Sequence, residues 1–180
     1  ENFSAESLDT LCGIILTGNE YDVPPNFYGE EPHLKTSIAA DNMRLDFEVE
    51  LINHAFNKSV PLLAICGGAQ LLNVAFDGSL HQHIPDVNGD GIKHRQTAGT
   101  FHLSAHSIEI LSETLLYTIS GTQTAEINSN HHQAINKPGD GFIINATAPD
   151  GTIEGIEHTG HPFLLGVQWH PEFECSIIDN

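Results

Sequence analysis

An apolar run that ends in Cys66 and two glycines is the feature that most constrains the fold of this chain. Residues 62–65 are all apolar, and residues 69–74 continue with the apolar spacing of a helix. This pattern predicts a buried strand, a sharp turn at the cysteine and a helix directly after it. Such a turn presents a nucleophile outside the sheet, and the helix N-terminus behind it favours a thiolate. The alternative is a buried cysteine that closes a hydrophobic strand, because cysteine is among the most buried residue types.

Apolar segments on either side of this turn extend the alternation of strands and helices. Residues 11–16 predict a buried strand, residues 22–32 a proline-rich loop, and residues 41–56 a helix capped by Asp41, with Met43 on its apolar face. Downstream we expect an irregular segment at 80–99, a hairpin of strands 100–103 and 107–110, a helix or turn at 111–119, and strands at 126–128, 141–148, 152–157 and 163–168. The order strand, helix, strand, helix predicts a mostly parallel sheet flanked by helices, and 180 residues suffice for one domain with its own core.

Composition excludes several classes of partner. The formal net charge is −18, from 24 acidic and only 6 basic residues, so we expect neither nucleic acid nor an anionic membrane surface as a partner. No apolar run approaches the roughly 20 residues that span a bilayer, and no signal segment opens the sequence. The three cysteines, Cys12, Cys66 and Cys175, are odd in number and far apart. They indicate a reducing compartment, and we expect a cytoplasmic protein.

Histidine is frequent in this chain, with 12 residues. Close pairs are His81 with His83, His102 with His106, and His131 with His132. No pair has the tight spacing of a zinc motif, so we predict surface or active-site histidines and no metal, with a metal site as the open alternative.

His170 is the best candidate for a base that activates the Cys66 thiol. It follows an apolar strand, as Cys66 does, and the ends of parallel strands meet at one edge of a sheet. Pro171 holds His170 in extended conformation, and the spacing of Glu172 then returns its carboxylate to the same face. Cys66, His170 and Glu172 are therefore predicted as nucleophile, base and orienting acid.

A tetrahedral intermediate at Cys66 would need two backbone N–H donors. Gly67 follows the nucleophile directly and supplies one candidate. The turn at Gly18 and Asn19, after the first strand, supplies the second. Gln70 lies one helical turn beyond Cys66, where it either faces the substrate or is a solvated helix residue.

Four segments, in order, resemble the class I glutamine amidotransferase-like proteins, and among them the gamma-glutamyl-gamma-aminobutyrate hydrolase family. They are residues 15–30 (oxyanion and substrate loop), 64–74 (nucleophile elbow), 128–133 (the N-S-x-H-H-Q segment) and 166–172 (the His/Glu strand). The resemblance implies a flavodoxin-like α/β fold, with residues 1–180 as a single domain. It matches Cys66, His170 and Glu172 to the triad, Gly18 and Gly67 to the oxyanion hole, and Gln70 and His132 to substrate-side positions.

The activity that the resemblance implies is hydrolysis of a gamma-glutamyl amide bond through a thioester on Cys66. It implies a small gamma-glutamyl substrate and no metal or organic cofactor, and it leaves a homodimer open. Two alternatives remain: a glutaminase subunit that delivers ammonia to a separate synthase, and a catalytically impaired relative.

The sequence departs from the family pattern at the elbow and at its start. The usual elbow is G-x-C-x-G, often with arginine after the cysteine, whereas Ala64 and Gly67 stand at these positions here. The family normally begins with a further strand–helix–strand stretch ahead of the first strand seen here. We therefore expect the first residues of this chain to pack where that stretch would lie.

Overall fold

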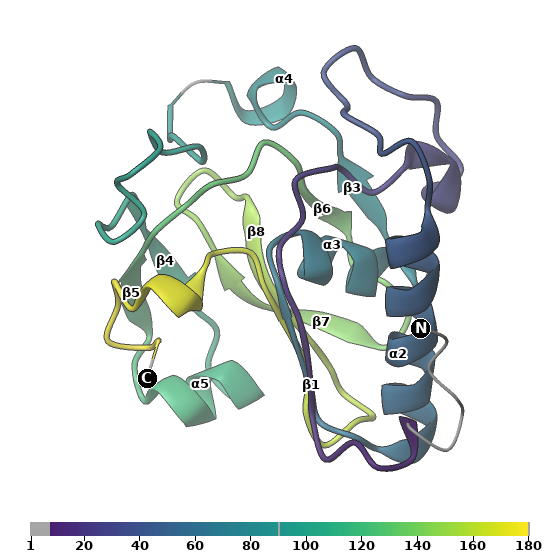
Figure 1. Cartoon of the computed structure of the whole chain (residues 1–180). Helices are drawn as coiled ribbons and strands as arrows, with labels where there is room; N and C mark the ends of the chain where they lie inside the picture. Colours follow the sequence, from purple (N-terminus) through teal and green to yellow (C-terminus); the bar gives the residue numbers. More distant parts are fainter. Residues whose placement is uncertain (1–7, 90, 180) are drawn as a thin grey trace.

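The computed structural model describes residues 8–89 and 91–179, which form a curled mixed sheet flanked by helices (Figure 1). Its elements are β1 (Ile14–Leu16), η1 (Pro25–Tyr28), α2 (Met43–Lys58), β2 (Leu62–Ile65), α3 (Gly67–Val74), β3 (Ser79–His81), α4 (Pro85–Asn88), β4 (His106–Ile110), α5 (Leu115–Ser120), β5 (Thr124–Ile127), β6 (Ala134–Lys137), β7 (Phe142–Thr147), β8 (Ile153–His158), β9 (Leu164–Val167) and η2 (Pro171–Phe173). No helix in residues 8–89 and 91–179 has the length and apolar character needed to cross a membrane.

The sheet combines a parallel part with an antiparallel part. Its strand order is β1-β2-β9-β8-β7-β4-β5, and β6 joins β8 to β3. Among the strands of the described residues, β1, β2 and β9 pair in parallel, whereas the other pairs are antiparallel. The predicted α/β class is confirmed, whereas the predicted parallel pairing is found in these three strands alone. The short turns at 148–152 and 159–163 make β7, β8 and β9 antiparallel neighbours, because parallel pairs need a long crossover.

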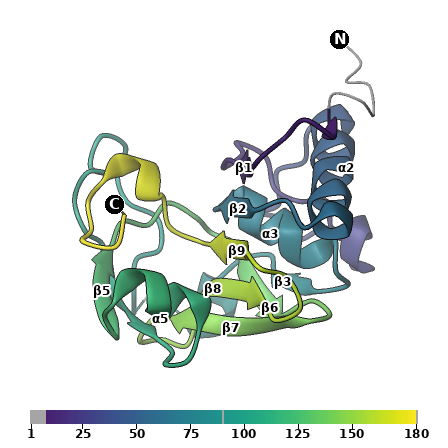
Figure 2. The ribbon, with the colours of Figure 1, turned by 90° about the horizontal axis from the view of Figure 1, so that it is seen from below.

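Apolar side chains fill both faces of the sheet. Leu45, Ile52 and Ala55 of α2 pack with the buried residues of α3 and of the parallel strands. A second cluster, which includes Ile108 and Trp169, lies beside α5. Figure 2 shows α2 and α3 beside β1 and β2, and α5 at the other side of the molecule. The two layers hold the ends of β1, β2 and β9 in place.

Several predicted elements differ from the structure. Residues 100–103 form turns instead of a strand, and β4 pairs with β5 and β7 instead of with them. The segment 80–99 contains α4, and β6 was not predicted. Met43 is 77% exposed, because Leu45 and Ile52 take the inward face of α2. β1 lies at the edge of the described sheet, but the packing expected for the first residues falls on residues 1–7, outside the described residues.

Candidate active site

Cys66 occupies a strained turn between β2 and α3. Its backbone has φ 50° and ψ −110°, a conformation that side chains rarely adopt. Gly68 makes the close approach of α3 to β1 possible, since a Cβ there would lie 2.6 Å from the backbone oxygen of Leu16. The predicted elbow is therefore present, and it turns the cysteine away from the strand that precedes it.

The surroundings of Cys66 favour its neutral thiol. Burial raises the pKa of Cys66 to about 12; the carboxylates of Glu172 and Glu154 act in the same direction, and the Gly67 N–H and the Gln168 amide oppose them. Gln168 Nε2 lies 3.6 Å from the sulfur and donates to it. The thiolate expected from the helix N-terminus is not the form that this environment favours, because burial outweighs the helix.

His170 and Glu172 form a hydrogen-bonded pair. His170 Nδ1 donates to Glu172 Oε1 over 2.7 Å. The predicted contact is present, but a 3-10 turn that begins at Pro171 produces it, instead of the extended chain expected from the sequence. His170 Nε2 is buried and has no hydrogen-bond partner among the residues described. The ring is thus oriented through one nitrogen, while the other remains available for a proton.

Gly18 lies between Cys66 and His170. A Cβ on Gly18 would be 3.6 Å from Cys66 Cβ and 3.1 Å from His170 Cε1. Both side chains therefore lie against the same glycine, at the carboxyl ends of the three parallel strands, where α/β proteins commonly bind ligands.

The peptide between Gly18 and Asn19 lies close to the elbow. Arg44 Nη2 of α2 donates to the Gly18 carbonyl over 3.0 Å. In a trans peptide the N–H points away from the carbonyl, so the Asn19 N–H faces away from Arg44. The Asn19 nitrogen lies 3.0 Å from the position of a Cβ on Gly67. The two predicted oxyanion segments, at Gly18–Asn19 and at Gly67, are thus adjacent.

Asn128, at the end of β5, holds the backbone of His170. Its Nδ2 donates to His170 O over 2.7 Å, and its Oδ1 accepts from His170 N over 2.8 Å. Sequence reasoning assigned no role to this residue, although it opens the segment 128–133. The curl of the sheet, which no sequence pattern shows, brings it to His170.

A cavity of about 910 Å³ opens beside the elbow. Its lining includes Cys66, Gly67, Gln70 and His132, but not His170, Glu172 or Gly18. Gln70 is buried, so the solvated alternative is wrong. Its amide donates to Gln133 O and Gln168 Oε1, both over 3.1 Å.

Polar and basic side chains form the opposite part of the cavity wall. His132 Nε2 lies 3.0 Å from Asp22 Oδ1, which joins the segment 128–133 to the loop after β1. Lys35, Lys93 and Arg95 also line the cavity. These are three of only six basic residues in the chain, and they line the cavity together with the acidic residues Glu20 and Asp22.

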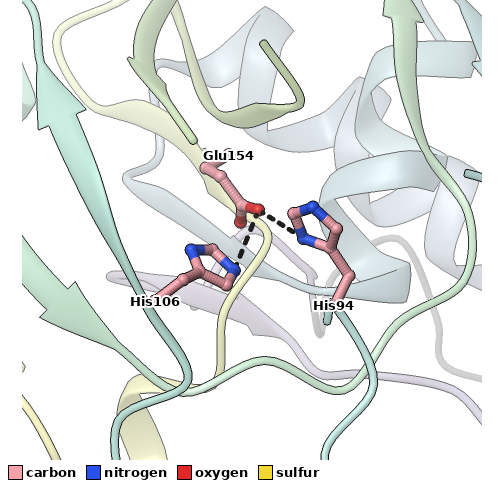
Figure 3. A group of neighbouring side chains, drawn as sticks. All are labelled: His94, His106 and Glu154. Carbon is pink, nitrogen blue, oxygen red and sulfur yellow. Dashed lines mark ion pairs between the residues drawn. The ribbon is translucent and has the colours of Figure 1, made fainter. Parts of the chain in front are cut away.

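A cluster of buried imidazoles lies next to this cavity. His94, His106 and Glu154 converge, as Figure 3 shows, and His131 approaches the same carboxylate. The structure splits the sequence pairs, since only one member of the pair 102/106 and one of the pair 131/132 takes part. No spacing motif could have found this group, because its members come from four separate segments.

Comparison with known proteins places this chain in a family. Residues 1–172 match the peptidase C26 family. A Mycobacterium tuberculosis relative, Rv2859c, whose name assigns it provisionally to the glutamine amidotransferases, is 42% identical over 92% of this chain and 52% of its own length. The gamma-glutamyl-gamma-aminobutyrate hydrolase PuuD of Escherichia coli is 33% identical, over 94% of this chain and 67% of PuuD. The chain thus spans about half to two thirds of the length of these relatives.

Solved structures support the fold. The glutaminase domain of Trypanosoma brucei CTPS, with bound acivicin, superposes with a TM-score of 0.61 at 17% identity, over 93% of this chain and 66% of that domain. A glutamine amidotransferase from Methylobacillus flagellatus gives a TM-score of 0.58 at 16% identity, over 91% of this chain and 71% of that chain.

Proposed function

Because this chain belongs to the peptidase C26 family, we propose that it is a cysteine-dependent hydrolase that cleaves a gamma-glutamyl amide bond. The observation that carries this proposal is the position of Gly18, in contact range of both the strained Cys66 and the imidazole of His170. Acyl transfer needs a nucleophile, a base close to it and a carboxylate that is hydrogen-bonded to the base.

In the proposed reaction, His170 Nε2 takes the proton of the Cys66 thiol as the sulfur attacks the amide carbonyl. Glu172 stabilises the resulting imidazolium, and the N–H groups of Gly67 and Asn19 stabilise the oxyanion. The intermediate expels the amine, which receives the proton from His170, and leaves a thioester on Cys66. Water, activated by His170, then hydrolyses the thioester and releases glutamate and the free thiol.

The charge of the cavity fits a substrate that carries a carboxylate. A gamma-glutamyl group keeps its α-carboxylate free, and Lys35, Lys93 and Arg95 line the cavity beside Cys66. These cations could replace the arginine that often follows the cysteine in the family, where Gly67 stands here. We assign Gln70 and His132 to the shape and polarity of the same wall.

The test is glutamate release from gamma-glutamyl amines and from glutamine, by the wild type and by Cys66→Ala. We expect the substitution to lower kcat by at least about 10³-fold, because removal of a covalent nucleophile eliminates the thioester route. Cys12→Ala, which changes an exposed cysteine, is the matched control and should keep the wild-type rate. Equal rates for the wild type and Cys66→Ala would refute the proposal.

A second measurement separates hydrolysis from the alternatives. The glutamine-like electrophile 6-diazo-5-oxo-norleucine should label Cys66 and block glutamate release together. Labelling without turnover on any gamma-glutamyl amine would favour a glutaminase subunit that needs its synthase partner, whereas no labelling would favour a catalytically impaired relative.

The three free thiols of the described chain also agree with our proposal of a reducing, cytoplasmic location.

A further inference from the structure

Three histidines surround a fully buried carboxylate next to the cavity. Glu154 of β8 has none of its surface exposed, and its Oε1 lies 3.1 Å from His94 Nδ1, 3.6 Å from His106 Nε2 and 3.6 Å from His131 Nε2. All three rings are also buried. The four side chains come from the segment after α4, the start of β4, the segment between β5 and β6, and β8. Figure 3 shows His94 and His106 aimed at the carboxylate.

Each imidazole is oriented by an acceptor on its far side. His94 Nε2 lies 2.9 Å from Asp150 Oδ2, His106 Nδ1 3.1 Å from its neighbour's carbonyl, and His131 Nδ1 2.9 Å from Gln133 O. These oxygens can only accept, so the outer nitrogens carry the protons. In its neutral form, each ring therefore directs an unprotonated nitrogen at Glu154. Outer partners of this kind accompany the histidine ligands of metal sites.

The inner atoms of the cluster make no hydrogen bond of favourable geometry, although His94 Nδ1 and Glu154 Oε1 are 3.1 Å apart. Within the described part of the chain, this holds for His94 Nδ1, His106 Nε2, His131 Nε2 and both oxygens of Glu154. Several buried lone pairs that face one another are unfavourable unless a positive charge lies between them. A single imidazolium, for instance His94, would satisfy one contact and leave the other nitrogens unpaired.

We propose that His94, His106 and Glu154 bind a divalent cation of the zinc class, with His131 adjacent to them. Their ligand atoms all lie within 4.8 Å of one another. Ligand atoms about 2.0–2.2 Å from a tetrahedral Zn²⁺ lie about 3.3–3.6 Å from one another. Glu154 Oε1 lies 3.1 Å from His94 Nδ1 and 3.6 Å from His106 Nε2, which is close to this edge length. Two imidazole nitrogens and one carboxylate oxygen are suitable zinc ligands.

A cation at this position would have a structural role, because its three ligands are buried and include neither Cys66 nor His170. It would join β8 to the segment after α4 and to the start of β4. His94 and His131 also line the cavity, so the cation would fix one wall of the candidate active site. Cys66 and His170 do not belong to the cluster, and the metal proposal therefore does not depend on the proposed reaction.

The experiment is zinc binding by the full chain after treatment with a chelator, measured by calorimetric titration and by elemental analysis after desalting. We expect about one Zn²⁺ per chain in the wild type, and less than about a tenth of this in His106→Ala and Glu154→Gln. His102→Ala changes an exposed histidine four positions from His106 and should keep the full amount. Cys66→Ala should also keep it.

Three results would overturn the proposal: no zinc retained by the wild type, full retention by both ligand variants, or loss of zinc in Cys66→Ala, which would place the metal on the thiol. If a ligand variant does not fold, as judged by circular dichroism, the wild type loaded with Co²⁺ decides. A strong four-coordinate ligand-field spectrum without a thiolate charge-transfer band is expected. A weak six-coordinate spectrum or a thiolate band would contradict the assignment.

Discussion

The thiol of Cys66 is subject to two opposing influences. The N-terminus of α3 and the Gly67 N–H favour the thiolate, whereas burial favours the neutral form and raises the pKa to about 12. We therefore expect the Cys66 thiol to be protonated near neutral pH in the ligand-free protein. In the proposed mechanism His170 removes the thiol proton only when the substrate carbonyl is in place for attack by the sulfur.

The reaction of Cys66 with iodoacetamide should show this pKa directly. Only the thiolate reacts, and below a pKa of about 12 its fraction rises about tenfold with each pH unit. We expect the labelling rate to increase steadily from about pH 7 to about pH 10. Trypsin releases residues 59–93 as one peptide that holds Cys66 and no other cysteine, so mass spectrometry can follow this thiol alone. A plateau at or below about pH 8 would show that the free protein stores a thiolate.

Local sequence patterns mark some residues of the predicted site, and the structure brings these residues close together. Cys66, His170 and Glu172 each follow an apolar run, and the structure places the first two against Gly18 and the last two in a pair. Asn128 and Gln168 have no such signal, because their contacts depend on which strands become neighbours. The ligands around Glu154 escape sequence analysis for the same reason.

The contact between β1 and α3 is the element-scale feature on which the elbow depends. Gly68 faces the Leu16 carbonyl so closely that a methyl group would lie 2.6 Å from backbone oxygen. The helix cannot rotate away without moving Cys66, since both belong to one turn. The glycine at this position is therefore required by packing, whatever the chemistry of the site.

Gly68→Ala should destabilise the protein measurably. We expect a loss of about 1–3 kcal/mol in the free energy of unfolding, the usual cost of overpacking, because the obstructing atom is backbone. Urea denaturation followed by circular dichroism measures it. Gly13→Ala is the matched control, since its methyl group would meet Pro61 O at an ordinary 3.8 Å. If the two variants unfold at the same urea concentration, the close contact is absent in solution.

Elements were predictable where a run of apolar residues is bounded by turn residues. β2, β9 and α3 lie within one or two residues of their predicted positions. β6 has only two apolar residues, and its pairing with β3 and β8 supplies the stability that its sequence lacks. The strand predicted at 100–103 does not form. Its expected partner β4 has β5 on one side and β7 on the other, so neither side is free for pairing.

At the scale of the whole molecule, charge is distributed unevenly. The chain carries a net charge of −18, yet half of its six basic residues line one cavity. Glu20 and Asp22 line the same cavity, so its basic residues exceed its acidic ones by one, whereas acidic residues far outnumber basic ones in the chain as a whole. The composition alone indicated only that polyanions are unsuitable partners.

Lys93→Met should weaken the use of substrates that carry a free α-carboxylate. We expect kcat/KM to fall roughly twofold to fivefold, since an exposed ion pair contributes about 0.2–1 kcal/mol. Glutamate release measured at low and high salt should show the smaller salt dependence in the variant. Lys58→Met, on α2 and outside the cavity lining, is the matched control. A loss of the same size in both variants would assign the effect to net charge instead of to the cavity.

The hydrogen bonds from Asn128 to His170 also bear on how the protein folds. Three strands, β8, β7 and β4, separate β9 from β5 in the sheet, so these bonds form only after the sheet has curled. Asn128 and His170 are also 42 residues apart in sequence. Contacts between segments that are distant in sequence form slowly. A chain with correct local structure but an incomplete sheet would hold the elbow without the base beside it. During refolding, competence for catalysis should therefore return with the last cooperative step and not with the first appearance of helices.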